Sequence, residues 1–122
     1  MSLEEIIKER SIQQKNELNH LAEWAEKVKV VLGPCTIILF GSYARGDFNL
    51  WSDLDLLLVS DYFENIRFLE RTDSLPELRR STDLICWTTR EFKISILKAS
   101  WKSALRDSIV IVDDYNISPL LK

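Results

Sequence analysis

The chain has 122 residues, of which 46% are hydrophobic and 29% charged, a balance typical of one globular domain and not of a disordered or fibrous protein. Its formal net charge of -3 argues against binding DNA by bulk positive charge, so nucleic acid is not an expected partner. No apolar run approaches the roughly 20 residues that span a bilayer, and the acidic start Met1–Glu5 does not resemble a secretory signal, so we expect a cytoplasmic protein that does not bind a membrane.

The first third of the chain has the pattern of a long helix. Ser2 and Glu5 have the spacing of a capping box, and apolar residues then recur at helical spacing. Gly33-Pro34 ends the pattern, because glycine favours a helix C-cap and proline cannot continue a helix. We therefore expect one helix over about residues 3–32, with a break near Ser11 left open.

Two strand-like segments follow this helix. Residues 36–40 are β-branched and apolar, which predicts a strand buried on both faces. Gly41-Ser42 interrupts it, and a brief helical segment is expected through Arg45. Residues 53–59 predict a second strand.

The second half continues the alternation of strands and helices. Residues 62–80 favour one helix with a loop or a short second helix, and residues 82–87 predict a third strand. Residues 91–106 have a partly helical rhythm, 109–112 predict a fourth strand, and 113–122 form a tail. Strands that alternate with helices around a small sheet indicate an α/β or α+β sandwich, which by itself says nothing about function.

Residues that could take part in catalysis or bind a ligand lie at the ends of three predicted strands. Gly41 allows close approach of a ligand to the backbone, and Ser42 begins a helical turn whose free N–H groups and hydroxyl favour a phosphate. Asp53 and Asp55 are two residues apart on a strand, so their carboxylates point the same way and repel each other unless a cation neutralises them. Asp83 begins the next strand and joins this pair if the two strands are neighbours.

Three carboxylates at one sheet edge indicate a magnesium site. Mg²⁺ prefers carboxylate oxygens and keeps positions open for water and substrate phosphates, and three carboxylates can hold two such ions. In this hypothesis one ion binds a nucleoside triphosphate, the other activates an acceptor hydroxyl, and Asp83 is the base.

The residues around these motifs resemble a family signature. The matching stretches are Gly41–Asp47 and Ser52–Leu57, which resemble the signature of the DNA polymerase beta-like nucleotidyltransferase superfamily. The similarity is greatest to its minimal nucleotidyltransferase (MNT) branch, whose pattern is Gly-Ser, ten residues and Asp-x-Asp. The resemblance covers about residues 36–112 and implies a single nucleotidyltransferase domain over 1–122. It also implies a small mixed sheet flanked by helices, ATP or another nucleoside triphosphate as substrate, and two Mg²⁺ ions.

The resemblance also implies a role for each site residue. Gly41 and Ser42 correspond to the residues that bind the β- and γ-phosphates, and Arg45 to an arginine that supports the loop or contacts substrate. The metal ligands are then Asp53, Asp55 and Asp83, with Asp83 also the base.

The acceptor is the open question. Larger relatives have a second domain that holds it, whereas this chain shows none, so the resemblance implies a partner protein or a second copy of the chain. Many MNT proteins are encoded beside a HEPN-domain ribonuclease toxin, and some are antitoxins that transfer AMP to a tyrosine of the toxin. The alternatives are an antitoxin that only blocks its partner sterically, with a site that at most binds nucleotide, and a transferase that modifies a small molecule.

Other prominent residues have structural interpretations. Cys35 and Cys86 lie in apolar runs and are expected to be reduced core residues. The tryptophans are expected to be core or interface anchors, and Trp51 is the exception that could contact a ligand base, since it lies two residues before Asp53. His20 is expected to have a structural role on the first helix. A set of arginines is expected to form a solvated face that could also guide a triphosphate or an acidic partner: Arg67, Arg71, Arg79, Arg80 and Arg90.

Overall fold

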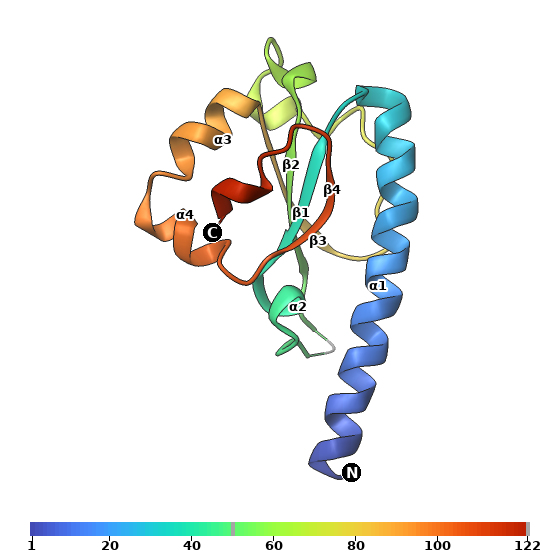
Figure 1. The fold of residues 1–122 in the computed structure, drawn as a ribbon. Helices are drawn as coiled ribbons and strands as arrows, with labels where there is room; N and C mark the ends of the chain where they lie inside the picture. Colours follow the sequence, from blue (N-terminus) through green and yellow to red (C-terminus); the bar gives the residue numbers. More distant parts are fainter. Residues whose placement is uncertain (50, 122) are drawn as a thin grey trace.

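The computed structural model describes residues 1–49 and 51–121, whose centre is a four-stranded sheet in the order β3-β2-β1-β4 (Figure 1). The strands are β1 (Thr36–Phe40), β2 (Leu54–Val59), β3 (Thr82–Trp87) and β4 (Ile109–Asp113). β1 is antiparallel to β2 and β4, whereas β2 and β3 are parallel. The expected α/β sandwich with a small mixed sheet is therefore confirmed, and the strand ends differ from the predicted ones by at most one residue.

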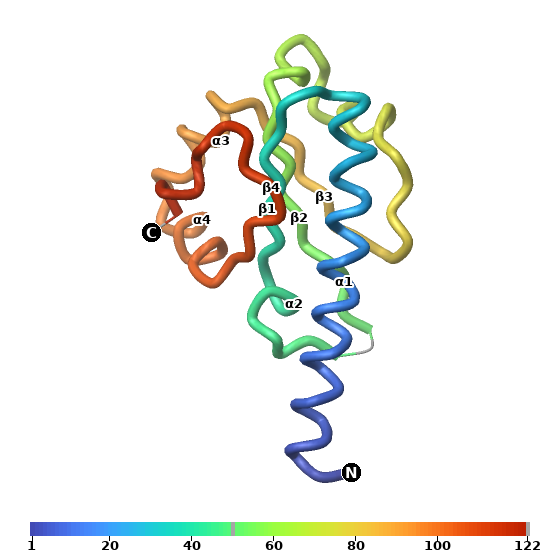
Figure 2. Tube along the Cα trace, turned by 45° about the vertical axis from the view of Figure 1, so that its right-hand side comes forward, coloured from blue at the N-terminus to red at the C-terminus, as the bar shows by residue number. Residues whose placement is uncertain are grey.

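Helix α1 (Leu3–Leu32) is continuous, without the break considered near Ser11. The hydroxyl of Ser2 accepts the backbone N–H of Glu5 at 3.1 Å, and Gly33 ends the helix with a φ of 76°. The C-terminal half of α1 packs along the sheet, whereas its first turns extend past the end of the sheet (Figures 1 and 2). Among the residues of α1 that the structure describes, none form an apolar span long enough to cross a membrane, and the same holds for the other described helices.

The sheet lies between two layers of apolar side chains because residues of the central strands alternate between its faces. One layer packs against α1, and the strands supply it with Ile37, Leu39, Leu54, Leu56 and Leu58. The other packs against α3 (Thr89–Ser95), and its buried residues include Ile38, Leu57, Val59, Trp87 and Phe92. In Figure 1, α1 covers one face, and α3 with α4 (Ala99–Ala104) covers the other. The strand of residues 36–40 is buried on both faces, as predicted.

The helix expected within residues 62–80 does not form. This segment contains only two short 3-10 turns, Asp61–Phe63 and Phe68–Glu70. The physical reason is that Arg71 turns inward and its guanidinium donates to the carbonyl oxygens of Ile66 and Cys86, at 2.9 and 3.0 Å. The backbone of this segment is irregular, and hydrogen bonds from the Arg71 side chain take the place of those that a helix would make.

The segment 91–106 forms two helices, α3 and α4, instead of one. Thr88 and Glu91 form a capping box that starts α3, since each side chain bonds the other's backbone N–H. After β4, the predicted tail contains a short 3-10 helix, Ser118–Leu121.

Both cysteines are buried and unpaired, as expected. Burial raises the pKa of the Cys86 thiol to about 12 and that of Cys35 to about 11, so both remain neutral core residues at physiological pH.

Asp113 at the end of β4 joins three segments of the fold. Its carboxylate accepts the Thr36 hydroxyl at 2.9 Å and the backbone N–H groups of Ile117 and Ser118 at 3.0 Å each. Partial burial pushes the pKa of Asp113 upward, but the hydrogen bonds from Ser118, Ile117 and Thr36 outweigh it and lower the pKa below 3.8.

We expect Asp113→Asn to lower the free energy of unfolding at pH 7 by about 1–3 kcal/mol, because an amide nitrogen cannot accept the N–H bonds of the carboxylate. A lowered pKa in the folded state stabilises the protein above the unfolded pKa, and this contribution disappears as the pH falls through the folded value. The difference between wild type and variant should therefore shrink below pH 3.8, as measured by urea unfolding. An equal difference at pH 7 and pH 2.5 would contradict this account, and exposed Asp107→Asn is the control.

Candidate active site

The parallel pairing of β2 and β3 places two of the predicted carboxylates side by side. Asp55 on β2 and Asp83 on β3 are partners in the register of the two strands. Asp55 points toward the α3–α4 face of the sheet, because its neighbours Leu54 and Leu56 belong to the layer against α1. Asp53 immediately precedes β2, two residues before Asp55, and its negative charge acts on Asp55. The condition set from the sequence, that the strand of Asp83 must neighbour that of Asp55, is met.

The electrostatics of Asp55 reflect this crowding. Partial burial raises its pKa above 3.8, the negative charges of Asp83 and Asp53 raise it further, and the positive charge of Arg45 opposes them. A carboxylate that is both partly buried and next to two like charges is an unfavourable arrangement that a cation would relieve.

Gly41 packs directly against Asp55. It follows β1, whose last residue Phe40 pairs with Asp55, and it starts the short helix α2 (Gly41–Arg45) with a φ of 73°. A Cβ atom at this position would overlap Oδ2 of Asp55. Glycine is therefore required here for its positive φ and for the close approach of the backbone to the carboxylate. Ser42 lies half-buried in the first turn of α2.

Arg45 lies apart from the carboxylates. Its side chain is exposed and its Nε donates to Oδ2 of Asp47 at 3.1 Å. Two roles were left open for Arg45, support of the loop and contact with substrate. The hydrogen bond to Asp47 is a direct contact within the loop after α2, whereas Arg45 acts on Asp55 only through its charge.

Asp55 and Asp83 are among the residues that line an open groove of about 600 Å³. We call this the carboxylate groove, and its other lining residues are Phe40, Leu84, Ile85, Ser100, Trp101 and Ala104. Trp101 on α4 meets Phe40 edge to face, with ring centroids 5.9 Å apart, and Trp87 at 4.7 Å. The groove thus combines two acidic groups with an aromatic wall.

No pattern in the sequence places Trp101 or Phe40 at the site. Trp101 was expected to be a core or interface anchor, and only the packing of α4 against β1 brings it to the groove. Trp51, the tryptophan singled out near Asp53, is 88% exposed and does not line the groove.

Two members of the arginine set are not part of a solvated face. Arg71 is buried and bonds Glu91, whose pKa falls below its usual value because the hydrogen bonds from Arg71 and Thr88 outweigh the effect of partial burial. Arg80 bonds Glu17 and the carbonyl of Ser52, both at 3.1 Å, and its guanidinium lies 4.7 Å from the Tyr43 ring.

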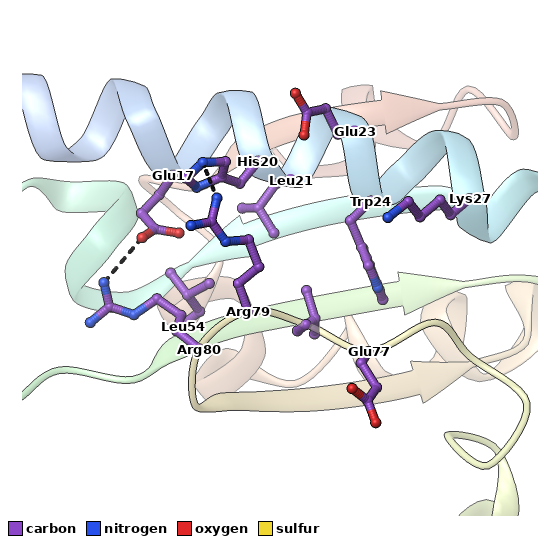
Figure 3. A pocket seen from close by; sticks show the side chains of 11 residues that line it. Glu17, His20, Leu21, Glu23, Trp24, Lys27, Leu54, Glu77, Arg79 and Arg80 are labelled. Carbon is purple, nitrogen blue, oxygen red and sulfur yellow. Dashed lines mark hydrogen bonds and ion pairs between the residues drawn. The ribbon is translucent and has the colours of Figure 1, made fainter.

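Arg80 therefore connects α1, α2 and the segment that leads to Asp53. Figure 3 shows Arg80 pointing to Glu17 and Arg79 in contact with His20. These residues line a small hollow, whose volume is about 60 Å³. His20 has the structural position expected of it, because this hollow lies between α1 and the segment before β3. Asp53, Asp55 and Asp83 are not among the residues that line it.

The donor set fits magnesium only together with a substrate. Within residues 1–49 and 51–121, no three His, Cys, Asp or Glu side chains stand close enough together to hold an ion by themselves. Asp53, Asp55 and Asp83 offer carboxylate oxygens only, which suit Mg²⁺, an ion that commonly takes one or two carboxylates and completes its shell with waters and phosphates. The residues present therefore fit Mg²⁺ delivered with a nucleotide and not a preformed protein cage.

The comparisons with known proteins identify the class. The model of the family described as "Nucleotidyltransferase domain" matches residues 19–112, so the chain belongs to this family, as the resemblance to the MNT branch indicated. A solved structure titled "putative nucleotidyltransferase from Sulfolobus solfataricus" has the same fold, with a TM-score of 0.62 and 22% sequence identity over 83% of this chain and 84% of that chain.

One curated relative is more specific but covers little of the chain. It is named "Putative protein adenylyltransferase MJ0604", from Methanocaldococcus jannaschii, and is 68% identical over 25 residues. The matched stretch spans 20% of this chain and 25% of the relative.

Proposed function

We propose that this nucleotidyltransferase domain transfers a nucleoside monophosphate, AMP from ATP, to a hydroxyl group of a partner protein. The observation that carries the proposal is the register pairing of Asp55 with Asp83 in an open groove, with Asp53 close by and Gly41 packed against Asp55. Like-charged groups gathered beside a glycine–serine corner are suited to a ligand that brings both cations and phosphates.

The proposed reaction is an in-line displacement at the α-phosphorus of ATP. The oxygen of the acceptor hydroxyl forms a bond to this phosphorus, and the bond from the phosphorus to the oxygen that bridges to the β-phosphate breaks. Pyrophosphate leaves with that electron pair, and Asp83 takes the hydroxyl proton. Gly41 and Ser42 hold the β- and γ-phosphates, and the missing Cβ of Gly41 lets the Asp55 carboxylate lie directly beside them.

Mg²⁺ bound by Asp53, Asp55 and Asp83 with the triphosphate would neutralise phosphate charge and lower the pKa of the acceptor hydroxyl. Asp55 is partly buried, so the strands hold its orientation, whereas Asp53 and Asp83 are exposed and free to adjust to the nucleotide.

A macromolecular acceptor is supported by two observations. Asp83 is exposed on β3, an outer strand of the sheet, and the groove beside it is open. The short match to a protein named as an adenylyltransferase of proteins agrees with this choice. We propose a HEPN-domain toxin as the acceptor, which makes the chain the antitoxin of a HEPN/MNT pair.

The test is transfer of label from α-labelled ATP to the protein encoded next to this one. We expect Mg²⁺-dependent labelling of that protein and loss of its toxicity, and we expect the Asp53→Asn/Asp55→Asn double variant to do neither. Exposed Asp73→Asn, in the turn-rich segment before β3, is the matched control and should behave as wild type.

Two outcomes would contradict the proposal. Equal labelling by the double variant would remove the carboxylates from the reaction. Full neutralisation of the toxin by the double variant, without labelling, would identify the chain as an antitoxin that acts by steric binding alone.

A further inference from the structure

The carboxylate groove is large enough for more than the reacting phosphate. Its volume of about 600 Å³ lies within the roughly 300–1,000 Å³ typical of small-molecule sites and exceeds the space that one acceptor side chain needs. The aromatic residue Phe40 directly precedes Gly41-Ser42, so the wall begins next to the proposed phosphate site. A ligand that is charged at one end and flat and apolar at the other matches this layout.

The side chains that line the groove indicate how it would recognise a nucleobase. Apart from Asp55 and Asp83, the lining residues are Phe40, Leu84, Ile85, Ala104 and Trp101, with Ser100 as the only uncharged polar side chain. Hydrogen-bonded readout of a base edge needs several placed donors and acceptors. Stacking needs only an aromatic surface, and because every base has a π-face, its strength depends on the ring area that overlaps and not on the groups at the edge of the base.

We infer that Trp101, supported by Phe40, is the stacking surface for the nucleobase, and that the site selects nucleotides by ring area, purines over pyrimidines, with little distinction between adenine and guanine. This inference rests on the proposed function and assigns the groove's aromatic wall to the nucleotide instead of the acceptor. Trp101 is half-buried, and its edge-to-face contacts with Phe40 and Trp87 hold it in place before a ligand binds. A fixed ring costs less conformational entropy on binding than a mobile one.

The test measures binding by calorimetry in the presence of MgCl₂, with ATP, GTP, CTP and inorganic tripolyphosphate as probes. Wild type should bind ATP and GTP with similar affinity, CTP several-fold more weakly, and tripolyphosphate most weakly. Trp101→Leu keeps the apolar bulk but removes the stacking surface, so it should lose about tenfold in affinity for ATP. Its affinity for tripolyphosphate should not change.

Two further variants calibrate this result. Trp101→Phe should recover part of the ATP affinity, because a smaller ring remains. Leu97→Ala is the matched control, since Leu97 lies between α3 and α4, is 74% exposed and does not line the groove.

Unchanged ATP affinity in Trp101→Leu would overturn the inference, and so would an equal loss of affinity for ATP and tripolyphosphate, which indicates a general disturbance. If the variants do not fold, the wild-type protein still tests the inference. Equal affinity of wild type for ATP and CTP would contradict selection by stacking area. Failure of wild type to bind any triphosphate would instead overturn the proposed function itself.

Discussion

Asp55→Asn is expected to lower the rate of nucleotidyl transfer on the order of 10³-fold, because loss of even one group that stabilises charge in a reacting site costs about 10²–10³-fold. Asp55 is the carboxylate most fixed by the fold, since it pairs with Phe40 on one side and with Asp83 on the other. Asparagine keeps the shape of the side chain and removes only the charge. The measurement is label transfer from ATP at saturating Mg²⁺.

The same variant should be more stable than wild type when nucleotide and divalent ions are absent. Removing the charge of Asp55 relieves its repulsion with Asp83 and Asp53 and the cost of partial burial. We expect the free energy of unfolding to rise by roughly 0.5–2 kcal/mol, the range common for a single stabilising substitution. Chemical unfolding in EDTA measures this, and Asp73→Asn should change neither quantity. A variant that is both inactive and less stable would show that Asp55 supports the fold.

Gly41→Ala is expected to reduce transfer by about 10²-fold, because a displacement of about 1 Å in a reacting group has effects of this size. The new methyl group would overlap Oδ2 of Asp55 and displace the carboxylate from its position between β1 and β3. A positive φ also strains any residue with a Cβ by roughly 1–2 kcal/mol, so stability should fall as well.

The chain contains two matched controls that separate strain from displacement. Gly33 and Gly46 also have positive φ values, 76° and 85°, but a Cβ at either position meets no atom within 4 Å. Gly33→Ala and Gly46→Ala should therefore lose stability without a comparable loss of transfer by the folded protein. Equal losses of activity in all three variants would indicate that backbone strain, and not contact with Asp55, explains the effect.

The regular parts of the fold could be predicted because their signals are local. The strands are short runs rich in apolar residues, such as residues 36–40 before Gly41, and α1 carries its own capping residues. The segment 62–80 could not be predicted, since its backbone follows the buried guanidinium of Arg71, whose partners lie as far along the chain as Glu91. A pattern read along the chain contains no information about such a contact.

The same division applies to the candidate site. The glycine–serine corner and the Asp-x-Asp pair are recognisable from spacing alone, and the neighbouring position of Asp83 depended on one strand pairing that the structure supplies. Trp101 and Arg80 could not be placed from the sequence. Each reaches its position through tertiary packing, of α4 against β1 for Trp101 and of Arg80 against Glu17 and Tyr43.

The order of strands has a consequence for how an acceptor arrives. Because β3 has a strand on one side only, Asp83 lies on an outer strand of the sheet and is exposed at the open carboxylate groove. If the acceptor is a protein, as we propose, a hydroxyl group on its surface can approach this edge of the sheet without first entering an enclosed cavity. The speed of modification should then depend on how well the two surfaces fit, and the enzyme would distinguish its target by shape before any chemistry begins.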